Sequence, residues 1–169
     1  MKLQKATFEA LTTARSWCQS EEEVQNWAGN VIQQSAGPEE LRQYWDSGVE
    51  NVANKEAWAL VSDKGDLAGY AEIASIDPVH RSCRLEKFII GPKELRGQGL
   101  GFGFLDLLKN HVFSELDAHR FELLVIERNA GARHLYEKSG FEVEGKLRDA
   151  RFYAGEFHNM EMMACISMT

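Results

Sequence analysis

The alternation of hydrophobic and polar positions divides the chain into a helical first part and a strand-rich remainder. A short strand is predicted at 3–7, and mainly helical spacing follows it. Ser20 with Glu23 forms a capping-box pattern that predicts the start of one helix, and Pro38 is expected at the start of another. From Ala57 onward, short apolar runs separated by turn residues predict strands instead.

The second part of the chain predicts strands interrupted by two helices. The predicted strands cover 57–62, 67–76, 83–90 and 121–127, with one after Gly140 and two around Ala154–Gly155. One helix is expected to run from a glycine-rich stretch to about Phe113, and the other from Ala130 to Lys138. This order predicts an α/β (α+β) fold with a mixed sheet rather than a barrel.

The stretch RGQGLG at 96–101 leads into a helix, although each glycine costs about 1 kcal/mol relative to alanine inside a helix. A dinucleotide-binding fingerprint fails because Phe102 or Phe104 stands where its last glycine is required, and a Walker loop lacks its Gly-Lys-Ser/Thr. The free amides at a helix start still form a candidate anion site, with Arg96 adding positive charge. The alternative is that the glycines only permit tight packing of the helix on the sheet.

Composition narrows the class of protein without naming a reaction. The 169 residues suit a single domain, 1–169, with 44% hydrophobic and 27% charged residues, as in soluble globular proteins. The formal net charge of −7 argues against general nucleic-acid binding and favours a cationic partner. The sequence shows no membrane span and no apolar signal-peptide segment, so we expect a cytoplasmic protein.

Cysteine and histidine positions predict neither a metal site nor a disulfide framework. Cys18, Cys83 and Cys165 are odd in number and lack paired metal-ligand spacing, so reduced thiols are expected. The five histidines are scattered, with no i, i+4 pair. No metal is therefore expected, and no histidine is spaced to activate a cysteine nucleophile.

Two motifs carry a resemblance to a known family. Arg96, Gly99 and Gly101 fit Arg/Gln-x-x-Gly-x-Gly/Ala, and NAGARHLYEKSGF at 129–141 fits Asn-x-x-Ala-x-x-x-Tyr-Glu-Lys-x-Gly-Phe. Together they resemble the GCN5-related N-acetyltransferase (GNAT) superfamily, and the C-terminal hairpin resembles its branch acting on ribosomal-protein N-termini and polyamines. The resemblance covers roughly 57–167. It implies a splayed, mostly antiparallel sheet of about six or seven strands with flanking helices.

The resemblance also implies acetyl-CoA as the cosubstrate. In the family the pantetheine arm lies along the fourth strand, and the pyrophosphate lies on the amides of the glycine loop. An asparagine at the end of the fifth strand bonds the pantetheine, although asparagine there also favours a helix N-cap. The residues expected to bind acetyl-CoA are Phe88, Ile89, Ile90, Arg96, Gly97, Gln98, Gly99, Leu100, Gly101 and Asn129.

Three residues are the catalytic candidates. Tyr136 matches the family's tyrosine that protonates the departing thiolate, a role open to a phenol facing a thiol. The attacking amine must lose a proton, for which a carboxylate or an ordered water would serve. Glu72 and Glu86 lie on the two strands expected to border the acceptor, and either could instead face solvent. Ser75 departs from the polyamine enzyme, which carries a further acid there.

The sequence therefore predicts an N-acetyltransferase that acts on a primary amine by direct attack in a ternary complex. A protein N-terminal amine, a polyamine or other small amine, and an aminoglycoside-like compound stay open as acceptors. A non-catalytic CoA-binding sensor is the alternative from another class, and a purely structural role would predict no CoA binding. A homodimer is compatible with the family. Trp17, Trp27 and Trp45 are expected to anchor the first helices or to line the acceptor pocket.

Overall fold

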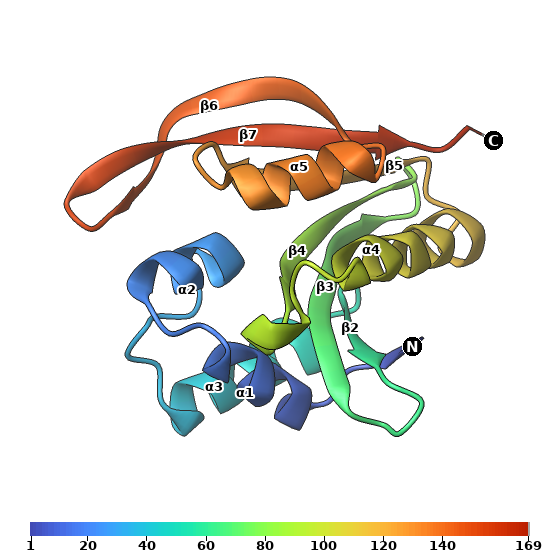
Figure 1. Ribbon diagram of the computed structural model, residues 1–169. Coiled ribbons are helices and arrows are strands. Elements are labelled where there is room, and N and C mark those ends of the chain that lie inside the picture. Colours follow the sequence, from blue (N-terminus) through green and yellow to red (C-terminus); the bar gives the residue numbers. More distant parts are fainter. Residues whose placement is uncertain (169) are drawn as a thin grey trace.

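The computed structural model describes residues 1–168, whose seven strands form one sheet (Figure 1). The strands are β1 (Lys2–Lys5), β2 (Glu56–Val61), β3 (Leu67–Asp77), β4 (Ser82–Ile90), β5 (Arg120–Ile126), β6 (Glu142–Tyr153) and β7 (Glu156–Ile166). The helices are α1 (Phe8–Ser16), α2 (Glu21–Ala28), α3 (Pro38–Trp45), α4 (Leu100–Asn110) and α5 (Ala130–Lys138). These bounds confirm the predicted α/β class and the predicted order of elements.

The strands follow the order β1-β2-β3-β4-β5-β7-β6. Only β4 and β5 are parallel among the described neighbours, because α4 carries the chain from one strand to the next. Their register pairs Ser82–Leu85 with Arg120–Leu123 and ends there, although both strands continue. The sheet is therefore splayed at its centre, as the resemblance implied.

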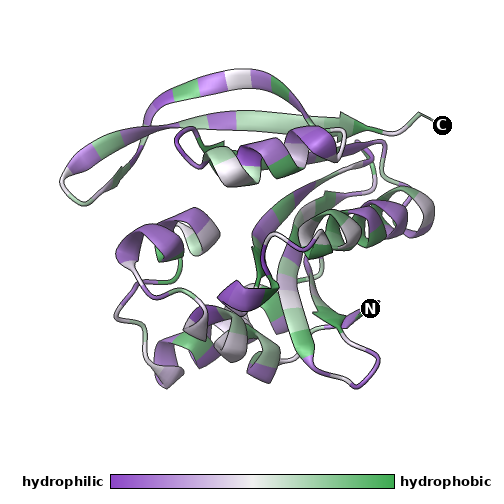
Figure 2. Ribbon diagram, in the orientation of Figure 1, coloured by the Kyte–Doolittle hydropathy of each residue, from purple (hydrophilic) through white to green (hydrophobic). Residues whose placement is uncertain are grey.

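The two faces of the sheet are covered by different helices. On β3, Ala71 and Ile73 pack in the core beneath α4 and α5, whereas Tyr70 packs with α1, α2 and α3 on the opposite face. This alternation follows from the two-residue period of a strand, and β3 is consequently buried on both sides. Figure 2 shows hydrophobic residues along these central strands and a mixture of hydrophilic and hydrophobic residues along β6.

Local signals in the sequence explain several element boundaries. Ser20 accepts a hydrogen bond from the backbone N–H of Glu23 at 3.2 Å, which confirms the predicted start of α2. The partner carboxylate of Glu23 bonds the N–H of Gln19 instead of the cap residue. α4 ends at Asn110 rather than Phe113, because a single π-helical turn, His111–Glu115, follows it.

A bulge interrupts β4 where it leaves β5. Between the pairs Tyr70–Ile89 and Glu72–Glu86, β4 contains one residue more than β3. The extra residue is accommodated at Lys87, whose φ of +47° lies in the left-handed region. The bulge re-aims the Lys87 side chain, which becomes buried beneath the sheet.

Candidate active site

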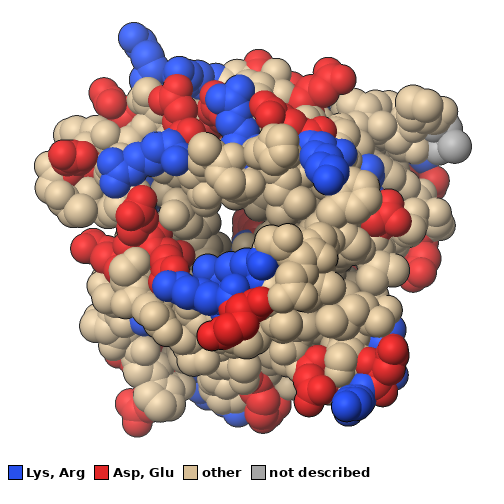
Figure 3. Space-filling model, in the orientation of Figure 1, with Lys and Arg blue, Asp and Glu red and all other residues tan. Residues whose placement is uncertain are grey.

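The splay between β4 and β5 opens into two cavities. The larger one, the loop cavity, has a volume of about 750 Å³, within the range of small-molecule sites. Its walls include Trp27, Phe88, Ile89, Ile90, Arg96, Gly97, Gly99, Gly101, Asn129 and Tyr136. Figure 3 shows a hollow near the centre of this face, with basic and acidic side chains along its rim. Eight of the ten residues predicted to bind acetyl-CoA thus border one cavity.

The glycine loop presents backbone to this cavity. Gly97 and Gly99 have φ values of +75° and +82°, which side-chain-bearing residues rarely adopt. Gly99 is the N-cap of α4, and no side chain caps the helix. The first amides of α4 and the positive end of its dipole are therefore available to an anion.

Neither Gly101 nor Gly103, the two glycines within α4, has a positive φ. A Cβ on Gly101 would stand 2.9 Å from Leu135, so this glycine lets α4 pack closely against α5. The packing alternative considered from the sequence thus applies at Gly101. A Cβ on Gly103 would meet nothing within 4 Å, and the structure gives no reason for a glycine there.

The basic side chains near the loop are held by neighbouring groups. Arg96 donates from Nε to the backbone oxygen of Ile90 at 2.8 Å, which ties the loop to the end of β4. The Glu23 carboxylate of α2 lies 3.0 Å from Lys93 and 3.7 Å from Arg96. The loop therefore carries positive charge that is only partly neutralised.

Two of the predicted cofactor residues do not line the loop cavity. The Gln98 side chain is exposed and donates to the backbone oxygen of Glu94 at 2.6 Å. Leu100 is half-buried and packs against the core beneath α4. In the structure these residues support the loop, and only their backbone could contact a ligand there.

The end of β4 forms one wall of the loop cavity. Phe88 packs against Phe104 and Tyr136, with ring centroids 5.2 Å and 6.2 Å away, whereas Ile89 packs toward the first three helices. Ile90 is buried in the core beneath α4. Their side chains thus serve the core, and beyond Leu85 the register of β4 with β5 has ended. The backbone on that edge is available to an extended ligand.

Asn129 lies at the start of α5 and borders the same cavity. Its side-chain oxygen accepts a hydrogen bond from the backbone N–H of Ala132 at 3.3 Å, so the residue is the N-cap of α5. Its side-chain NH₂ group has no partner among residues 1–168. The cap and the ligand role considered from the sequence are therefore compatible.

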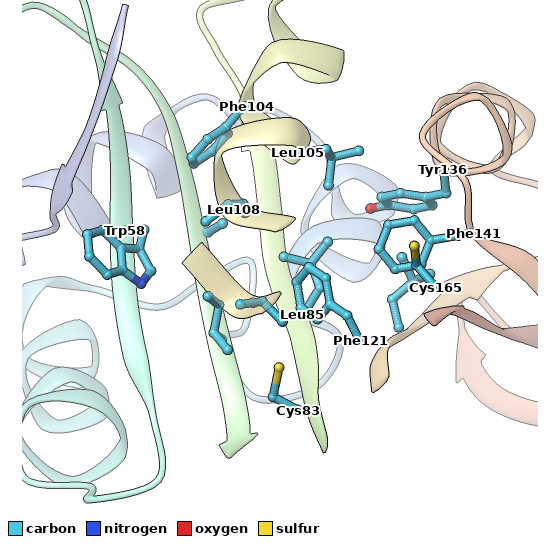
Figure 4. Packing of buried hydrophobic residues seen from close by; sticks show 14 of the residues in the cluster. Trp58, Cys83, Leu85, Phe104, Leu105, Leu108, Phe121, Tyr136, Phe141 and Cys165 are labelled. Carbon is cyan, nitrogen blue, oxygen red and sulfur yellow. The ribbon is translucent and has the colours of Figure 1, made fainter. Parts of the chain in front are cut away.

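Tyr136 stands between the two cavities and borders both. Figure 4 shows its ring extending from α5, with the hydroxyl oxygen at the inner end. Burial raises the pKa of the Tyr136 phenol, which therefore stays protonated at neutral pH. The hydroxyl bonds no other group of residues 1–168 and is free to donate to a ligand.

The smaller cavity, the hairpin cavity, has a volume of about 270 Å³ and lies between α2, β4, β5 and the β6–β7 hairpin. Glu86 borders it with a side chain that is 32% exposed. Lys55 and Lys87 lie 3.3 Å and 3.5 Å from the Glu86 carboxylate. This carboxylate is thus accessible from the cavity and lies in a positive environment.

Glu72 is placed differently, although it pairs with Glu86 across the two strands. It is fully buried and does not border either cavity. Four donors surround its carboxylate: Tyr44 at 2.6 Å, Tyr70 at 2.9 Å, Lys55 at 2.8 Å and Lys87 at 3.2 Å. A carboxylate has about four lone-pair sites, so none is left for a substrate proton.

Charge pairing fixes the ionisation of Glu72. Burial by itself would raise the pKa of its carboxyl, but the positive charges of Lys87 and Lys55 outweigh burial and hold the pKa below its usual value. Glu72 therefore stays ionised as the centre of a buried network beneath the β4 bulge. Its partners come from α3, β3, β4 and the segment before β2.

The sequence left open whether Trp27 anchors the first helices or lines the acceptor pocket, and it indicated no role for Lys87. The indole of Trp27 donates to the backbone oxygen of Lys87 at 2.7 Å, and Trp27 borders both cavities. Among the three tryptophans considered, Trp45 is buried in the core of the first helices. The bulge at Lys87 has no signature in the sequence, because it depends on the pairing of β3 with β4.

The cysteines are poor nucleophiles in this structure. Burial raises the pKa of Cys18 to about 11 and that of Cys83 to about 12, so both are thiols at neutral pH. Within residues 1–168 no three His, Cys, Asp or Glu side chains gather as metal ligands. No helix over the same residues is long and apolar enough to cross a membrane.

Comparison with known families shows which family this chain belongs to. The family model "Acetyltransferase (GNAT) domain" matches residues 2–142, most of the chain. The chain belongs to the GNAT family. This confirms the resemblance found in the sequence, and the acyl donor of GNAT enzymes is acetyl-CoA. The loop cavity is consequently the candidate site for acetyl-CoA in this GNAT protein.

Individual relatives agree with the family. Spermidine N(1)-acetyltransferase of Escherichia coli K12 is 32% identical over 127 residues, which cover 75% of this chain and 66% of that one. The Vibrio cholerae enzyme of the same name is 30% identical over 126 residues, covering 74% and 70%. The chain thus spans about two thirds of the length of these relatives.

Solved structures confirm the fold. The spermidine N-acetyltransferase of Vibrio cholerae, in complex with CoA and spermine, superposes with a TM-score of 0.85. The two sequences are 22% identical, and the match covers 98% of this chain and 94% of that chain. The predicted splayed, mostly antiparallel sheet with flanking helices is therefore the GNAT fold.

Proposed function

We propose that this GNAT protein transfers the acetyl group of acetyl-CoA to a primary amine by direct attack in a ternary complex. The observation that carries the proposal is the position of Tyr136, which borders a cavity on each side. One cavity has the glycine loop at its wall, and the other has an accessible carboxylate. Acetyl-CoA in one cavity and an amine in the other could thus meet beside the Tyr136 phenol.

The loop cavity suits the shape and charge of CoA. The uncapped amides that follow Gly99 would hold the pyrophosphate, and Arg96 would add positive charge. The backbone of Phe88 to Ile90 would pair with the amides of the pantetheine arm, which lies like an added strand. The NH₂ group of Asn129 would donate to the same arm from the opposite wall.

Tyr136 would act as the general acid. Acetyl-CoA supplies a thioester, whose carbonyl carbon forms the new C–N bond as the C–S bond breaks. The Tyr136 hydroxyl then gives its proton to the departing sulfur, and solvent restores that proton. Because the phenol is protonated at neutral pH, it can donate without a preceding proton uptake.

Glu86 is the better candidate for receiving the proton of the attacking amine. Its carboxylate borders the hairpin cavity, whereas that of Glu72 is saturated by four donors. A proton could pass to Glu86 directly or through one water. We assign Glu72 to holding the β4 bulge instead.

The names of the relatives suggest spermidine as one acceptor to try. An assay of CoA thiol release from acetyl-CoA tests the proposal, with spermidine, a dipeptide with a free N-terminus and other primary amines as acceptors. A thermal shift with CoA accompanies it. The proposal expects both a shift and amine-dependent release. A shift without release from any amine would point to the sensor alternative, and no shift would remove the cofactor site.

A further inference from the structure

Arg151 of β6 reaches across the hairpin cavity to α2. A Cβ placed on Gly29, at the end of α2, would lie 3.0–3.1 Å from the Arg151 guanidinium. The guanidinium therefore packs against bare backbone, and a side chain at Gly29 would displace it. Arg151 also lines the hairpin cavity together with Met160, whose sulfur lies 3.5 Å from its terminal nitrogen.

The Arg151 guanidinium has no carboxylate partner. Within residues 1–168 no Asp or Glu oxygen lies within 4.0 Å of it, although twenty ion pairs are found elsewhere. Its Nε atom is buried and has no hydrogen-bond partner. A buried donor without an acceptor is costly, so the position calls for a ligand oxygen.

The other cationic groups around the cavity are already paired. Arg84 donates to Glu122 at 2.5 Å and 3.0 Å. Lys87 lies 3.2 Å from Glu72. This leaves Arg151 as the unpaired positive group at the wall, opposite in sign to the accessible carboxylate of Glu86.

A cavity with one carboxylate and one unpaired guanidinium complements a ligand that carries both a cationic amine and an oxygen acceptor. The amine would lie toward Glu86, and an oxygen acceptor would lie toward Arg151, which binds carboxylates and carbonyls through its planar fork. A linear polyamine offers only cationic nitrogens. It would leave the Arg151 donors unsatisfied and add like-charge repulsion.

We infer that Arg151 is a specificity-determining residue that selects amines carrying a nearby carboxylate or carbonyl oxygen. This role rests on the proposed function. Free amino acids and peptide N-terminal residues share this chemistry. Arg151 recognises the acceptor and takes no part in the transfer of the acetyl group.

Matched acceptors test this inference. The specificity constant kcat/KM is measured for alanine, alanyl-alanine, ethylamine and spermidine, with wild type, Arg151→Met and Arg151→Lys. We expect an oxygen-bearing acceptor to exceed ethylamine roughly 10- to 100-fold in wild type, as for a charge-assisted hydrogen bond. Arg151→Met should abolish this preference through KM, and Arg151→Lys should restore part of it. Alanine against alanyl-alanine separates a carboxylate from a peptide carbonyl.

The control variant is Arg148→Met, which removes an exposed arginine of the same strand and should change nothing. Calorimetric binding of the same compounds to the CoA-loaded protein separates two kinds of failure. Acceptor binding that depends on Arg151 without acetyl transfer would sink the proposed function and keep the inference. Equal use or binding of all four compounds, or a preference for spermidine unaffected by Arg151→Met, would overturn the inference.

Discussion

The two cavities beside Tyr136 are built by opposite means. The loop cavity presents backbone groups at its wall: the amides at the start of α4 and the edge of β4 beyond Leu85. The hairpin cavity presents side chains, among them Glu86 and Arg151. Backbone groups are the same in every protein, whereas side chains can be exchanged singly. Under the proposed function, single substitutions could therefore change the amine acceptor while the binding of acetyl-CoA stays the same.

The walls of the two cavities are also held in place by different means. The loop is shaped by glycines at positive φ, and one hydrogen bond from Arg96 ties it to β4. Beneath the hairpin cavity, the β4 bulge is held by the buried charges around Glu72 and by the Trp27 indole. At each cavity, substitutions can therefore distinguish residues that hold the wall in place from residues that would contact the ligand.

The largest expected effect comes from Glu72→Gln, which leaves Lys55 and Lys87 without their buried counter-charge. Removing one partner of a buried ion pair costs about 3–5 kcal/mol in unfolding free energy. Urea denaturation measures the loss of unfolding free energy. Glu144→Gln is the control, since the surface ion pair of Glu144 with Arg120 contributes about 0–1 kcal/mol. Wild-type stability in Glu72→Gln would mean that the network does not hold the bulge.

The same residue predicts a dependence of stability on pH. Because the folded-state pKa of Glu72 lies below its unfolded value, its contribution is fully present above the unfolded value. It is lost as the pH falls through the folded-state pKa. Stability of Glu72→Gln should therefore decline less steeply in acid than that of wild type, as followed by thermal unfolding at successive pH values.

Tyr136→Phe tests the point where the two cavities meet. We expect kcat to fall about 100-fold, at the low end for general acids, because a thiolate of pKa ~8.5 leaves fairly readily. CoA affinity should change little, since only the hydroxyl is removed. Steady-state kinetics and calorimetry give the two values. Tyr153→Phe, which removes the hydroxyl of a buried tyrosine that lines neither cavity, is the control. Unchanged turnover in Tyr136→Phe would remove the acid role.

Gly99→Val tests the backbone-built side. A β-branched residue at a φ of +82° costs about 1–3 kcal/mol, so the loop would leave the conformation that presents its amides. CoA affinity should fall about 10- to 100-fold by calorimetry. Gly103→Ala is the matched control: it should keep CoA affinity and stabilise α4 by about 1 kcal/mol. An affinity of Gly99→Val for CoA equal to that of wild type would mean that the loop does not bind CoA.

The smallest effect is expected from Glu86→Gln on the side built from side chains. Turnover at neutral pH should fall about 10-fold, because a water can replace the carboxylate in part. The deficit should shrink at high pH, where the free amine is more abundant. A pH–rate profile measures both, with the exposed Glu50→Gln as control. An unchanged profile would mean that Glu86 receives no proton.

The same contrast explains what could be predicted from the sequence. The glycine loop and the cap at Asn129 are local, because turn geometry and helix starts depend on neighbouring residues. They were predicted together with the order of strands and helices. The family motifs lie in these segments, so the loop cavity was largely anticipated.

The hairpin cavity was not predictable in the same way. Glu72 and Glu86 both appear as acids on neighbouring strands, and only the bulge at Lys87 determines that one is saturated and the other accessible. Trp27 lies far from the motifs in sequence, and Arg151 lies in the C-terminal hairpin, ten residues after the second motif. Both meet the site only through the packing of α2 and β6. Such contacts depend on tertiary structure and leave no local pattern.

The most direct test is two-substrate kinetics of thiol release, with acetyl-CoA and amine varied independently for wild type, Gly99→Val and Arg151→Met. The account predicts amine-dependent release in wild type, a raised KM for acetyl-CoA in Gly99→Val, and a raised KM for the amine in Arg151→Met. No amine-dependent release, or both variants raising the same KM, would contradict it.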